Sequence, residues 1–400
     1  MNLKTFFRNC PICNCARGEV LHTQKFILSH NHPLKDGYAV VHCDQCGFCF
    51  ADTSATQSDY DEFYANFSKY SDNKTSTGGG ANPTDLERIC EMAAQIGRVW
   101  DRSARILDIG CANGGLLREL RTLGFVRLCG IDPSSTCVEQ TRIASGAEAF
   151  KGTLFNMPAE AGTFDGVVLS HVLEHIRDLK PALTGLQRFM NPGAWLYIET
   201  PDATRYKDCL TSPFQDFNTE HINHFSPANM LNLLSQCGFI PSLQAQKTIF
   251  SAPGMPYPAL FVFAALGLDH APALAIEKDG KLKAALLDYI VASRRIMDGI
   301  EKQLQAVISR HPELIVWGTG QLTMKLLGET SLSRANIVAF VDSNPANQGK
   351  FLRGVPVVAP QSLVADDVPI LVASTINAGS ILASIQQLNL TNPTIRLVVN

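Results

Sequence analysis

The sequence predicts an α/β protein built on a doubly wound parallel sheet, followed by a second and smaller sheet domain. Short apolar segments that end in glycine turns occur twice, at residues 106–115 and 314–320, and a helical pattern follows each of them. Ahead of both, four cysteines stand in two close pairs, Cys10-x-x-Cys13 and Cys43-x-x-Cys46. Strands that alternate with helices are typical of parallel sheets, because each crossover between parallel strands is usually a helix.

Length and charge restrict the class of protein. A chain of 400 residues is too long for one core, so two or three domains are expected. The net charge of −3 disfavours a broad nucleic-acid-binding face. The most apolar run, residues 259–268, is about half the length that crosses a bilayer, and the N-terminus becomes polar too early for a secretory signal. We therefore expect a cytoplasmic protein without nucleic-acid or membrane partners, and no pattern defines its oligomeric state.

The two cysteine pairs predict a structural zinc site. A spacing of two residues lets both sulfurs of a pair reach one ion, and two pairs complete a tetrahedral set of Cys10, Cys13, Cys43 and Cys46. The alternative is four unliganded thiols. Four thiolates leave no open coordination position, so we expect no catalytic role for this metal. Four neighbouring residues could also be ligands, and packing or exposure is our interpretation of each: Cys15, Cys49, His22 and His42.

The first glycine turn has a spacing that separates it from a dinucleotide site. A dinucleotide site uses Gly-x-Gly-x-x-Gly to bring the backbone onto a pyrophosphate. Here the turn is Gly110-x-Ala112-x-Gly114, with Asp108 directly before it. Asp132 follows the next predicted strand, about 20 residues on, where an acid can accept hydrogen bonds from ribose hydroxyls. We interpret this unit as a site for S-adenosylmethionine, which has no pyrophosphate.

Later segments extend this unit to a complete sheet. Residues 164–169 predict a buried strand, and the polar run 170–176 follows at the carboxyl edge, where open α/β sheets bind ligands. A Pro-Gly turn at 191–193 then leads into a strand at 194–199. The order of these motifs resembles the class I S-adenosylmethionine-dependent methyltransferases, and the resemblance covers about residues 85–245.

That resemblance implies which residues hold the cofactor. The first turn would line the methionine end, Asp132 would bind the ribose, and the segment Thr153-Leu154-Phe155-Asn156 would lie beside the adenine. His171, Glu174 and His175 belong to a stretch that opens a helix in many members of the class, whatever their substrate. The expected cofactor-binding residues are Asp108, Gly110, Gly114, Asp132, Leu154, Phe155 and Ser170.

A carboxylate and an imidazole stand together at Glu220-His221, just before a predicted helix. Ser226 is a plausible N-cap for this helix and Pro227 its first residue. An imidazole can take and return a proton near neutral pH, and an adjacent carboxylate can orient it or bind a substrate hydroxyl. The simpler alternative is that Glu220 and His221 only tie a loop to the helix.

With this motif the whole chain resembles the sugar C-methyltransferases that act on nucleotide-linked keto-deoxysugars. They combine a zinc-binding module, a class I domain and a C-terminal Rossmann-like domain. The resemblance implies that His221 is the base, that Glu220 binds or orients, and that His175 lies near the reacting sugar. Two positions where the family often has tyrosine are Asn218 and His224 here, and a phenol from Tyr64 or Tyr70 could replace one of them.

The last third predicts a second βαβ sheet behind a long amphipathic pattern. Residues 277–310 are expected to form two helical stretches. The turn Gly318-x-Gly320-x-x-Thr323 lacks the third glycine of a dinucleotide fingerprint, so we do not expect NAD there. The resemblance implies that this domain helps to hold the nucleotide of the substrate, and a purely structural role is the alternative.

These expectations combine into three parts. They are a zinc-binding module at 1–70, a methyltransferase domain at 71–270, and a helical linker with a Rossmann-like substrate-binding domain at 271–400. The polar, glycine-rich stretch 71–83 is expected to be a linker or a lid. The expected reaction is C-methylation of a nucleotide-linked keto-deoxysugar. The alternatives are O-methylation of a saccharide or small metabolite, and a module that binds the cofactor without catalysis.

Overall fold

The computed structural model describes residues 6–66, 78–267 and 275–398, and the chain forms two compact units. The first unit contains the glycine turn at Gly110 and the Glu220-His221 motif, and the second contains the turn at Gly318. Both units are assembled from separated pieces of chain. The first comprises Met1–Glu19, Val41–Cys209 and Glu220–Ala285, and the second comprises Val20–Val40, Leu210–Thr219 and Leu286–Asn400.

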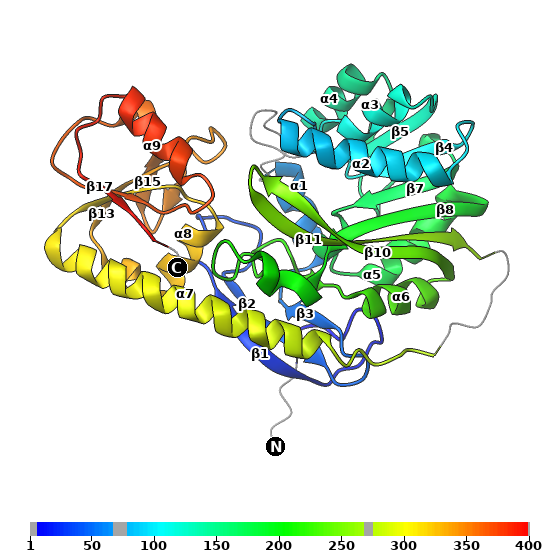
Figure 1. The fold of residues 1–400 in the computed structure, drawn as a ribbon, viewed down its shortest axis with the longest axis horizontal. Helices are drawn as coiled ribbons and strands as arrows, with labels where there is room; N and C mark the ends of the chain where they lie inside the picture. Colours follow the sequence, from blue (N-terminus) through cyan, green and yellow to red (C-terminus); the bar gives the residue numbers. More distant parts are fainter. Residues whose placement is uncertain (1–5, 67–77, 268–274, 399–400) are drawn as a thin grey trace. The chain divides into compact units, whose positions relative to one another are not determined.

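A seven-stranded sheet forms the centre of the first unit (Figure 1). Five neighbouring strands, β8, β7, β4, β5 and β6, are parallel. β10 and β11 form an antiparallel hairpin, and β11 pairs antiparallel with β8. β4 is central, with β5 on one side and β7 on the other, so the strand order reverses beside it. In spatial order the strands are β10 (Phe239–Ala252), β11 (Met255–Leu266), β8 (Met190–Pro201), β7 (Phe164–Ser170), β4 (Arg105–Ile109), β5 (Arg127–Asp132) and β6 (Glu148–Lys151).

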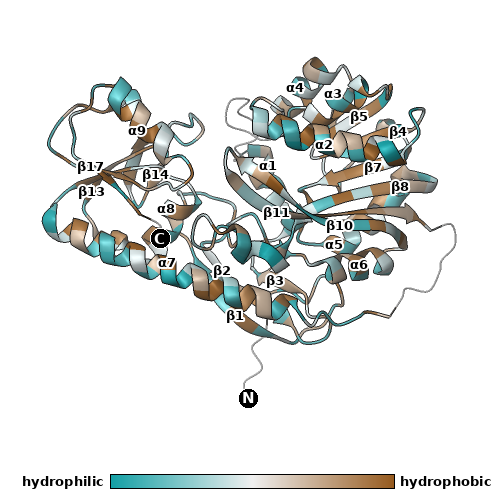
Figure 2. Cartoon of the chain, in the orientation of Figure 1, coloured by the Kyte–Doolittle hydropathy of each residue, from teal (hydrophilic) through white to brown (hydrophobic). Residues whose placement is uncertain are grey.

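Helices cover both faces of this sheet. Figure 1 shows α2 to α4 on one side and α5 and α6 on the other. The apolar stripes of α2 and α3 pack with Trp100, Phe263 and the central strands in one buried cluster. In Figure 2 the strands are predominantly brown while the helices show teal turns, as expected for an interior sheet under amphipathic helices. The helices are α2 (Pro83–Val99), α3 (Gly115–Thr122), α4 (Ser135–Ser145), α5 (Leu179–Leu186) and α6 (Pro227–Gln236).

Local sequence signals set where these helices begin. Ser226 caps α6 by accepting a hydrogen bond from the backbone N–H of Asn229, with Pro227 in the first position, as the sequence predicts. α2 begins in the same way, because Asn82 accepts from the N–H of Asp85. α3 instead starts from Gly114, whose φ of 75° lies in the left-handed region that glycine tolerates best.

A smaller sheet carries the cysteine pairs, in the order β1-β2-β3-β9. Its last strand, β9, is only Asn223–His224, and it pairs antiparallel with Cys49 and Phe50 of β3. The segment that follows His221 is therefore tied to the cysteine-bearing part of the chain. The other strands are β1 (Gly18–Lys25), β2 (Gly37–Cys43) and β3 (Cys49–Asp52), and the short helix α1 (Gln57–Asn66) follows them.

The second unit contains a six-stranded sheet whose first two neighbours, β14 and β15, are antiparallel and whose other pairs are parallel. Its apolar strands pack on Ala378, Ile381 and Ile385 of α9. The prediction of a second βαβ sheet is thus correct. The elements are β12 (Leu314–Trp317), α8 (Gln321–Glu329), β13 (Ile337–Val341), β14 (Phe351–Leu352), β15 (Val355–Val358), β16 (Ile370–Val372), α9 (Ala378–Gln387) and β17 (Thr394–Arg396).

Most of the segment at 277–310 forms one helix, and most of the segment at 259–268 forms one strand. The pattern at 277–310 is one helix, α7 (Leu282–Arg310), and the expectation of two stretches is wrong. The Asp279 carboxylate accepts hydrogen bonds from the N–H groups of Lys281 and Leu282 and so sets the start of the helix. The apolar run at 259–268 contributes most of its length to β11. Within the described ranges, no helix combines the length and apolarity that a membrane span requires.

Close packing of α2 on the sheet gives a stability test. A Cβ on Gly166 of β7 would lie 2.7 Å from two ring atoms of Trp100, whereas a Cβ on Gly185 of α5 would meet no atom within 4 Å. We expect Gly166→Ala to lower the free energy of unfolding by about 1–3 kcal/mol through overpacking. Gly185→Ala, the matched control, should be neutral or stabilising by up to about 1 kcal/mol. Urea denaturation of both variants measures this, and equal stabilities would contradict the packing described.

Candidate functional site

The turn after β4 is shaped to admit a ligand against its backbone. Gly110 and Gly114 both have φ of 75°, and Ala112 between them has a φ of 47°. The N–H groups of Gly110 and Cys111 donate to the carbonyl of Ile131, which fixes the turn against β5. A Cβ at Gly114 would lie 2.8 Å from the Cα of Thr141, so only glycine fits. These constraints leave the turn little freedom beyond the path observed.

Two buried carboxyl groups flank this turn. Asp108 and Asp132 are 4% and 7% exposed. Burial raises the pKa of Asp108 to about 8, and the nearby Asp132 carboxylate acts in the same direction. Burial also raises the pKa of Asp132, to about 6, although the N–H groups of Ser134 and Ala112 donate to it and partly offset the rise. A cationic ligand at Asp108 would favour its ionised form.

The other residues expected to touch the cofactor lie at the same carboxyl edge of the sheet. Leu154 is buried and Phe155 is half-buried in the turn that follows β6. Thr153 Oγ1 accepts hydrogen bonds from the N–H groups of Phe155 and Asn156 and thereby shapes this turn. Ser170 ends β7, and its buried hydroxyl has no hydrogen-bond partner among the described residues. A ligand that covers the turn after β4 could satisfy it.

The end of the glycine-rich stretch before α2 lies directly on this turn. The Asp85 carboxylate accepts from the N–H groups of Gly78 and Gly80, and the carbonyl of Gly78 accepts from the N–H of Gly115. A Cβ at Gly115 would lie 2.6 Å from that carbonyl oxygen. These contacts hold residues 78–80 against the turn, and the choice between a linker and a lid stays a prediction. The preceding residues, 71–77, lie outside the described part of the chain.

Two imidazoles and a carboxylate gather beside the turn. Ligand atoms of Glu174, His175 and His221 all lie within 4.8 Å of one another, and the two rings have centroids 5.0 Å apart. Glu174 and His175 belong to the 3-10 helix η3 (Leu173–His175), which follows β7. Val172, directly before η3, would meet a Cβ on Gly110 at 3.0 Å. The cluster and the turn therefore belong to one site.

The two histidine-bearing segments are cross-linked by their backbones. The N–H of Ile222 donates to the carbonyl of Glu174 over 2.8 Å, and Nδ1 of His175 lies 3.1 Å from the carbonyl of Glu220. The amide of Asn223 donates to the carbonyls of Leu173 and Ile176 at 2.8 and 2.6 Å. These bonds fix His175 and His221 in mutual register.

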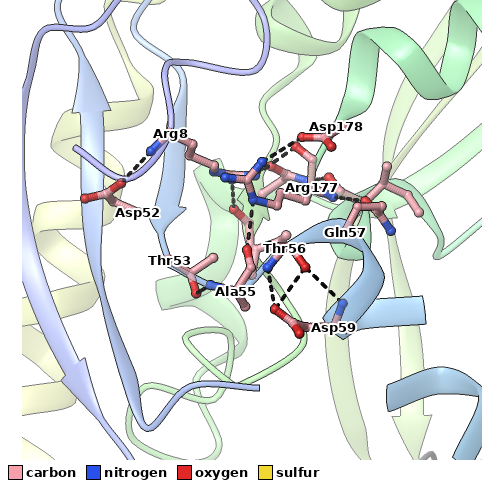
Figure 3. Close-up of polar contacts among 12 residues, drawn as sticks. Arg8, Asp52, Thr53, Ala55, Thr56, Gln57, Asp59, Arg177 and Asp178 are labelled. Carbon is pink, nitrogen blue, oxygen red and sulfur yellow. Dashed lines mark hydrogen bonds and ion pairs between the residues drawn. The ribbon is translucent and has the colours of Figure 1, made fainter. Parts of the chain in front are cut away.

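Arg8 adds a third connection between the same segments. Its buried guanidinium donates to the carbonyls of Arg177 and Ile222, both at 2.9 Å, and to Asn223 Oδ1 at 3.0 Å. Figure 3 shows Arg8 and Arg177 side by side, with Arg177 also bonded to the carbonyl of Ala55. Sequence reasoning missed Arg8, because no local pattern relates it to partners more than 160 positions away.

Glu174 lies at the end of a series of charged side chains that are buried or half-buried. His171 Nδ1 lies 3.1 Å from Glu174 Oε1, and His171 Nε2 lies 3.3 Å from Glu199 Oε1. Lys247 Nζ is 2.7 Å from Glu199 Oε2. Burial alone would lower the pKa of His171, but the two carboxylates outweigh it and raise it to about 8. The imidazolium donates through Nδ1 to Glu174 and forms an ion pair with Glu199, which orients Glu174.

Tyr64 and His224, whose roles the sequence leaves open, lie in different surroundings. Tyr64 of α1 donates to Glu220 Oε2 at 3.3 Å, and its ring lies 5.4 Å from that of His175. A phenol is therefore present at the cluster. Tyr70 lies outside the described residues. His224 is fully buried beside Tyr206, and burial lowers the pKa of His224 to about 3, so it is a neutral packed side chain.

The four cysteines of the two pairs meet at one point. Sγ of Cys10 lies 3.5 Å from that of Cys46, Sγ of Cys13 lies 3.4 Å from that of Cys43, and all four fall within 4.8 Å of one another. Tetrahedral zinc with bonds of about 2.3 Å would separate its sulfurs by about 3.8 Å. The set therefore fits a zinc ion after small adjustments. Cys15 is outside this set.

The glycine turn of the second unit is closed, because internal donors already bond to the carboxylate beside it. The carboxylate of Asp342, at the tip of β13, accepts from the N–H and the hydroxyl of Thr319, from the N–H of Asn344 and from the amide of Asn347. Gly318 has a φ of 104°, as a glycine turn requires. All the donors come from the same edge of the sheet as the carboxylate.

With this geometry in place, comparisons with known proteins assign the class. Residues 85–240 match the family model described as a methyltransferase domain, so this part of the chain is an S-adenosylmethionine-dependent methyltransferase domain. A ubiquinone biosynthesis O-methyltransferase of Brucella anthropi is 32% identical over 135 residues, which cover 31% of this chain and 54% of that protein. A malonyl-[acyl-carrier protein] O-methyltransferase of Legionella pneumophila is 27% identical over 166 residues, which cover 38% of this chain and 58% of that protein.

The chain thus spans about half the length of the curated relatives it matches. Among solved structures, a methyltransferase from Methanosarcina mazei is 19% identical with a TM-score of 0.38, and covers 44% of this chain and 98% of its own. A magnesium protoporphyrin IX methyltransferase from Synechocystis is 16% identical with a TM-score of 0.38, and the match covers 46% of this chain and 84% of that protein.

The raised pKa of Asp108 gives a testable consequence for cofactor binding. At pH 7 a carboxyl with a pKa of about 8 is mostly protonated, and a cationic ligand beside it favours the ionised form. Binding of S-adenosylhomocysteine, whose methionine end carries an ammonium, should therefore release up to about 0.9 proton per chain at pH 7. Calorimetry in two buffers of different ionisation enthalpy measures the release. Asp108→Asn should abolish it, and proton-neutral binding by the natural chain would contradict the assignment.

Proposed function

We propose that the protein transfers a methyl group from S-adenosylmethionine to a carbon of a nucleotide-linked keto-deoxysugar, with His221 as the base. The observation that carries this proposal is the pair of imidazoles of His175 and His221, held together beside the cofactor turn. Removal of a proton next to a ketone gives an enolate whose carbon can attack a methyl sulfonium. Glu220 would bind or orient the acceptor, and His175 would lie near its reacting group.

The residues of the turn fit the cofactor. Asp108, Gly110 and Gly114 would hold its methionine end and Asp132 its ribose, while Leu154, Phe155 and Ser170 would line the adenosine side. When bound, the cofactor supplies the electrophilic methyl group. The remaining task of the protein is to align the acceptor and accept its proton, and alignment alone can contribute several kcal/mol to catalysis.

The hydrogen bonds of His175 support a defined role for each nitrogen. A carbonyl oxygen can only accept, so Nδ1 of His175 donates to the carbonyl of Glu220 and Nε2 keeps its lone pair. Nε2 can then accept a hydrogen bond from an acceptor hydroxyl. Tyr64, whose hydroxyl donates to Glu220 at 3.3 Å, would supply the phenol that family members often provide at the position of Asn218.

O-methylation of a saccharide or small metabolite is the second candidate. The relatives named above are O-methyltransferases, and their matches lie within the methyltransferase part of the chain. A hydroxyl acceptor needs the same base as a carbon acid, so the cluster serves either reaction. The position of the transferred methyl group, read by NMR of the product, separates the two.

The base assignment is tested by replacing one imidazole. His221→Gln keeps size and polarity but cannot accept the proton, so the turnover rate should fall by about 10²–10⁴-fold. His311→Gln, a substitution in the second unit, is the control. Isotope-labelled methyl donor and a panel of nucleotide-linked keto-sugars provide the assay. Undiminished turnover by His221→Gln would refute the base, while cofactor binding without turnover of any acceptor would favour a non-catalytic module.

We also propose that Cys10, Cys13, Cys43 and Cys46 hold a structural zinc ion. Cys43→Ala should lower the zinc content by one equivalent per chain and reduce thermal stability, because binding free energy at such sites contributes to folding. Cys15→Ala, which removes a neighbouring thiol outside the set, should change neither. Elemental analysis and thermal melts measure the two effects. Unchanged zinc content in Cys43→Ala would rule out this ligand set.

A further inference from the structure

One atom of the histidine cluster is left without a partner. Oε2 of Glu174 makes no hydrogen bond within the described structure, although Glu174 is only 1% exposed. The other oxygen, Oε1, is held by His171. A buried acceptor without a donor destabilises the fold, and more so when it is charged. The unpartnered oxygen therefore marks a place for a cationic or hydrogen-donating group.

We propose that Glu174, His175 and His221 bind a divalent transition-metal ion of the zinc class, and that the bound ion stops methyl transfer. Two imidazole nitrogens and one carboxylate oxygen suit zinc, cobalt and nickel, whereas calcium and magnesium prefer oxygen ligands alone. Three protein ligands with an open position are also the usual number for an exchangeable zinc site. This site is separate from the four cysteines and has different ligand chemistry.

The distances allow an ion to enter with modest movement. The three ligand atoms lie within 4.8 Å of one another, and His175 Nε2 is 3.9 Å from Oε1 of Glu174, the oxygen that His171 holds. Tetrahedral zinc with bonds of about 2.1 Å separates its ligands by about 3.4 Å. Rotation of the Glu174 carboxylate and of the imidazoles, with ligand atoms moving up to about 1.4 Å closer together, would bring Oε2 and the two nitrogens to the ion.

The surroundings already hold the ligands as a metal site requires. The bond from His175 Nδ1 to the carbonyl of Glu220 leaves Nε2 as the coordinating atom. His171 holds Oε1 of Glu174 and leaves Oε2 for the ion. The bond between Ile222 and Glu174 fixes the two segments that carry the ligands. Such supporting bonds typically contribute 10–100-fold to metal affinity.

Metal binding and proton transfer exclude each other at His221. A nitrogen that donates its lone pair to a metal ion has none left to accept a proton from the acceptor. The ion would also occupy the space between the two imidazoles. This inhibitory consequence rests on the proposed function, whereas the binding of the ion does not depend on it.

A cobalt titration of the full-length protein, with its cysteine site filled by zinc, tests the binding. We expect one further equivalent of Co²⁺ with weak visible absorption and no thiolate charge-transfer band, because the ligands contain no sulfur. His175→Gln and Glu174→Gln should each weaken this binding by more than tenfold. His311→Gln and Glu313→Gln, which make the same replacements in the second unit, should leave it unchanged, and thermal melts check that all variants fold.

The proposal is overturned if the natural chain takes up no second equivalent, or if His175→Gln and Glu174→Gln bind it undiminished. Activity provides the second arm. Added Zn²⁺ should abolish methyl transfer, and a weak chelator that spares the cysteine site should restore it. Full activity with the second site loaded would overturn the inhibitory part. Failure to find any methyl acceptor would count against the proposed function alone, since the cobalt titration needs no acceptor.

Discussion

The whole site depends on hydrogen bonds that join the loop after β7 to the segment before β9. These two pieces of chain are about 45 residues apart, and each contributes one imidazole. The link between Ile222 and Glu174, together with the guanidinium of Arg8, holds both pieces at the carboxyl edge of the sheet. The turn after β4 ends at the same edge because β4 and β7 are parallel neighbours. The glycine turn and the imidazoles are thereby brought together by strand order and a few polar contacts.

Local signals allowed much of the fold to be predicted from the sequence. The glycine turn at Gly110 and Gly114, the strand that ends at Asp132 and the cap at Ser226 all follow from local sequence patterns, so these elements could be predicted from spacing. The close approach of the four cysteine sulfurs also agrees with the prediction from their spacing, although the ion itself remains a proposal. The pattern at 277–310 predicts two helical stretches, whereas the structure has the single helix α7. A glycine inside a helix costs only about 1 kcal/mol, so it need not end the helix.

The remaining features could not be predicted because they arise from contacts between distant residues. Arg8, Glu199 and Lys247 sit in segments that give no sign of the partners they meet. The buried series from Lys247 to Glu174 alternates in charge, which lowers the cost of taking these groups out of water. Removing one member would leave its neighbour as an uncompensated buried charge. Sequence shows that a buried strand carries a glutamate, but only the fold shows which cations neutralise it.

The closed turn at Asp342 has a thermodynamic consequence for the second unit. In Rossmann-type sites the acid at this strand tip is available to ribose hydroxyls. Here, Thr319, Asn344 and Asn347 already donate four hydrogen bonds to it, so a sugar would compete with internal donors. Exchange of one hydrogen bond for another yields little net affinity. Any nucleotide held by this domain would therefore gain its binding energy from base stacking or phosphate contacts, and the ribose would contribute least.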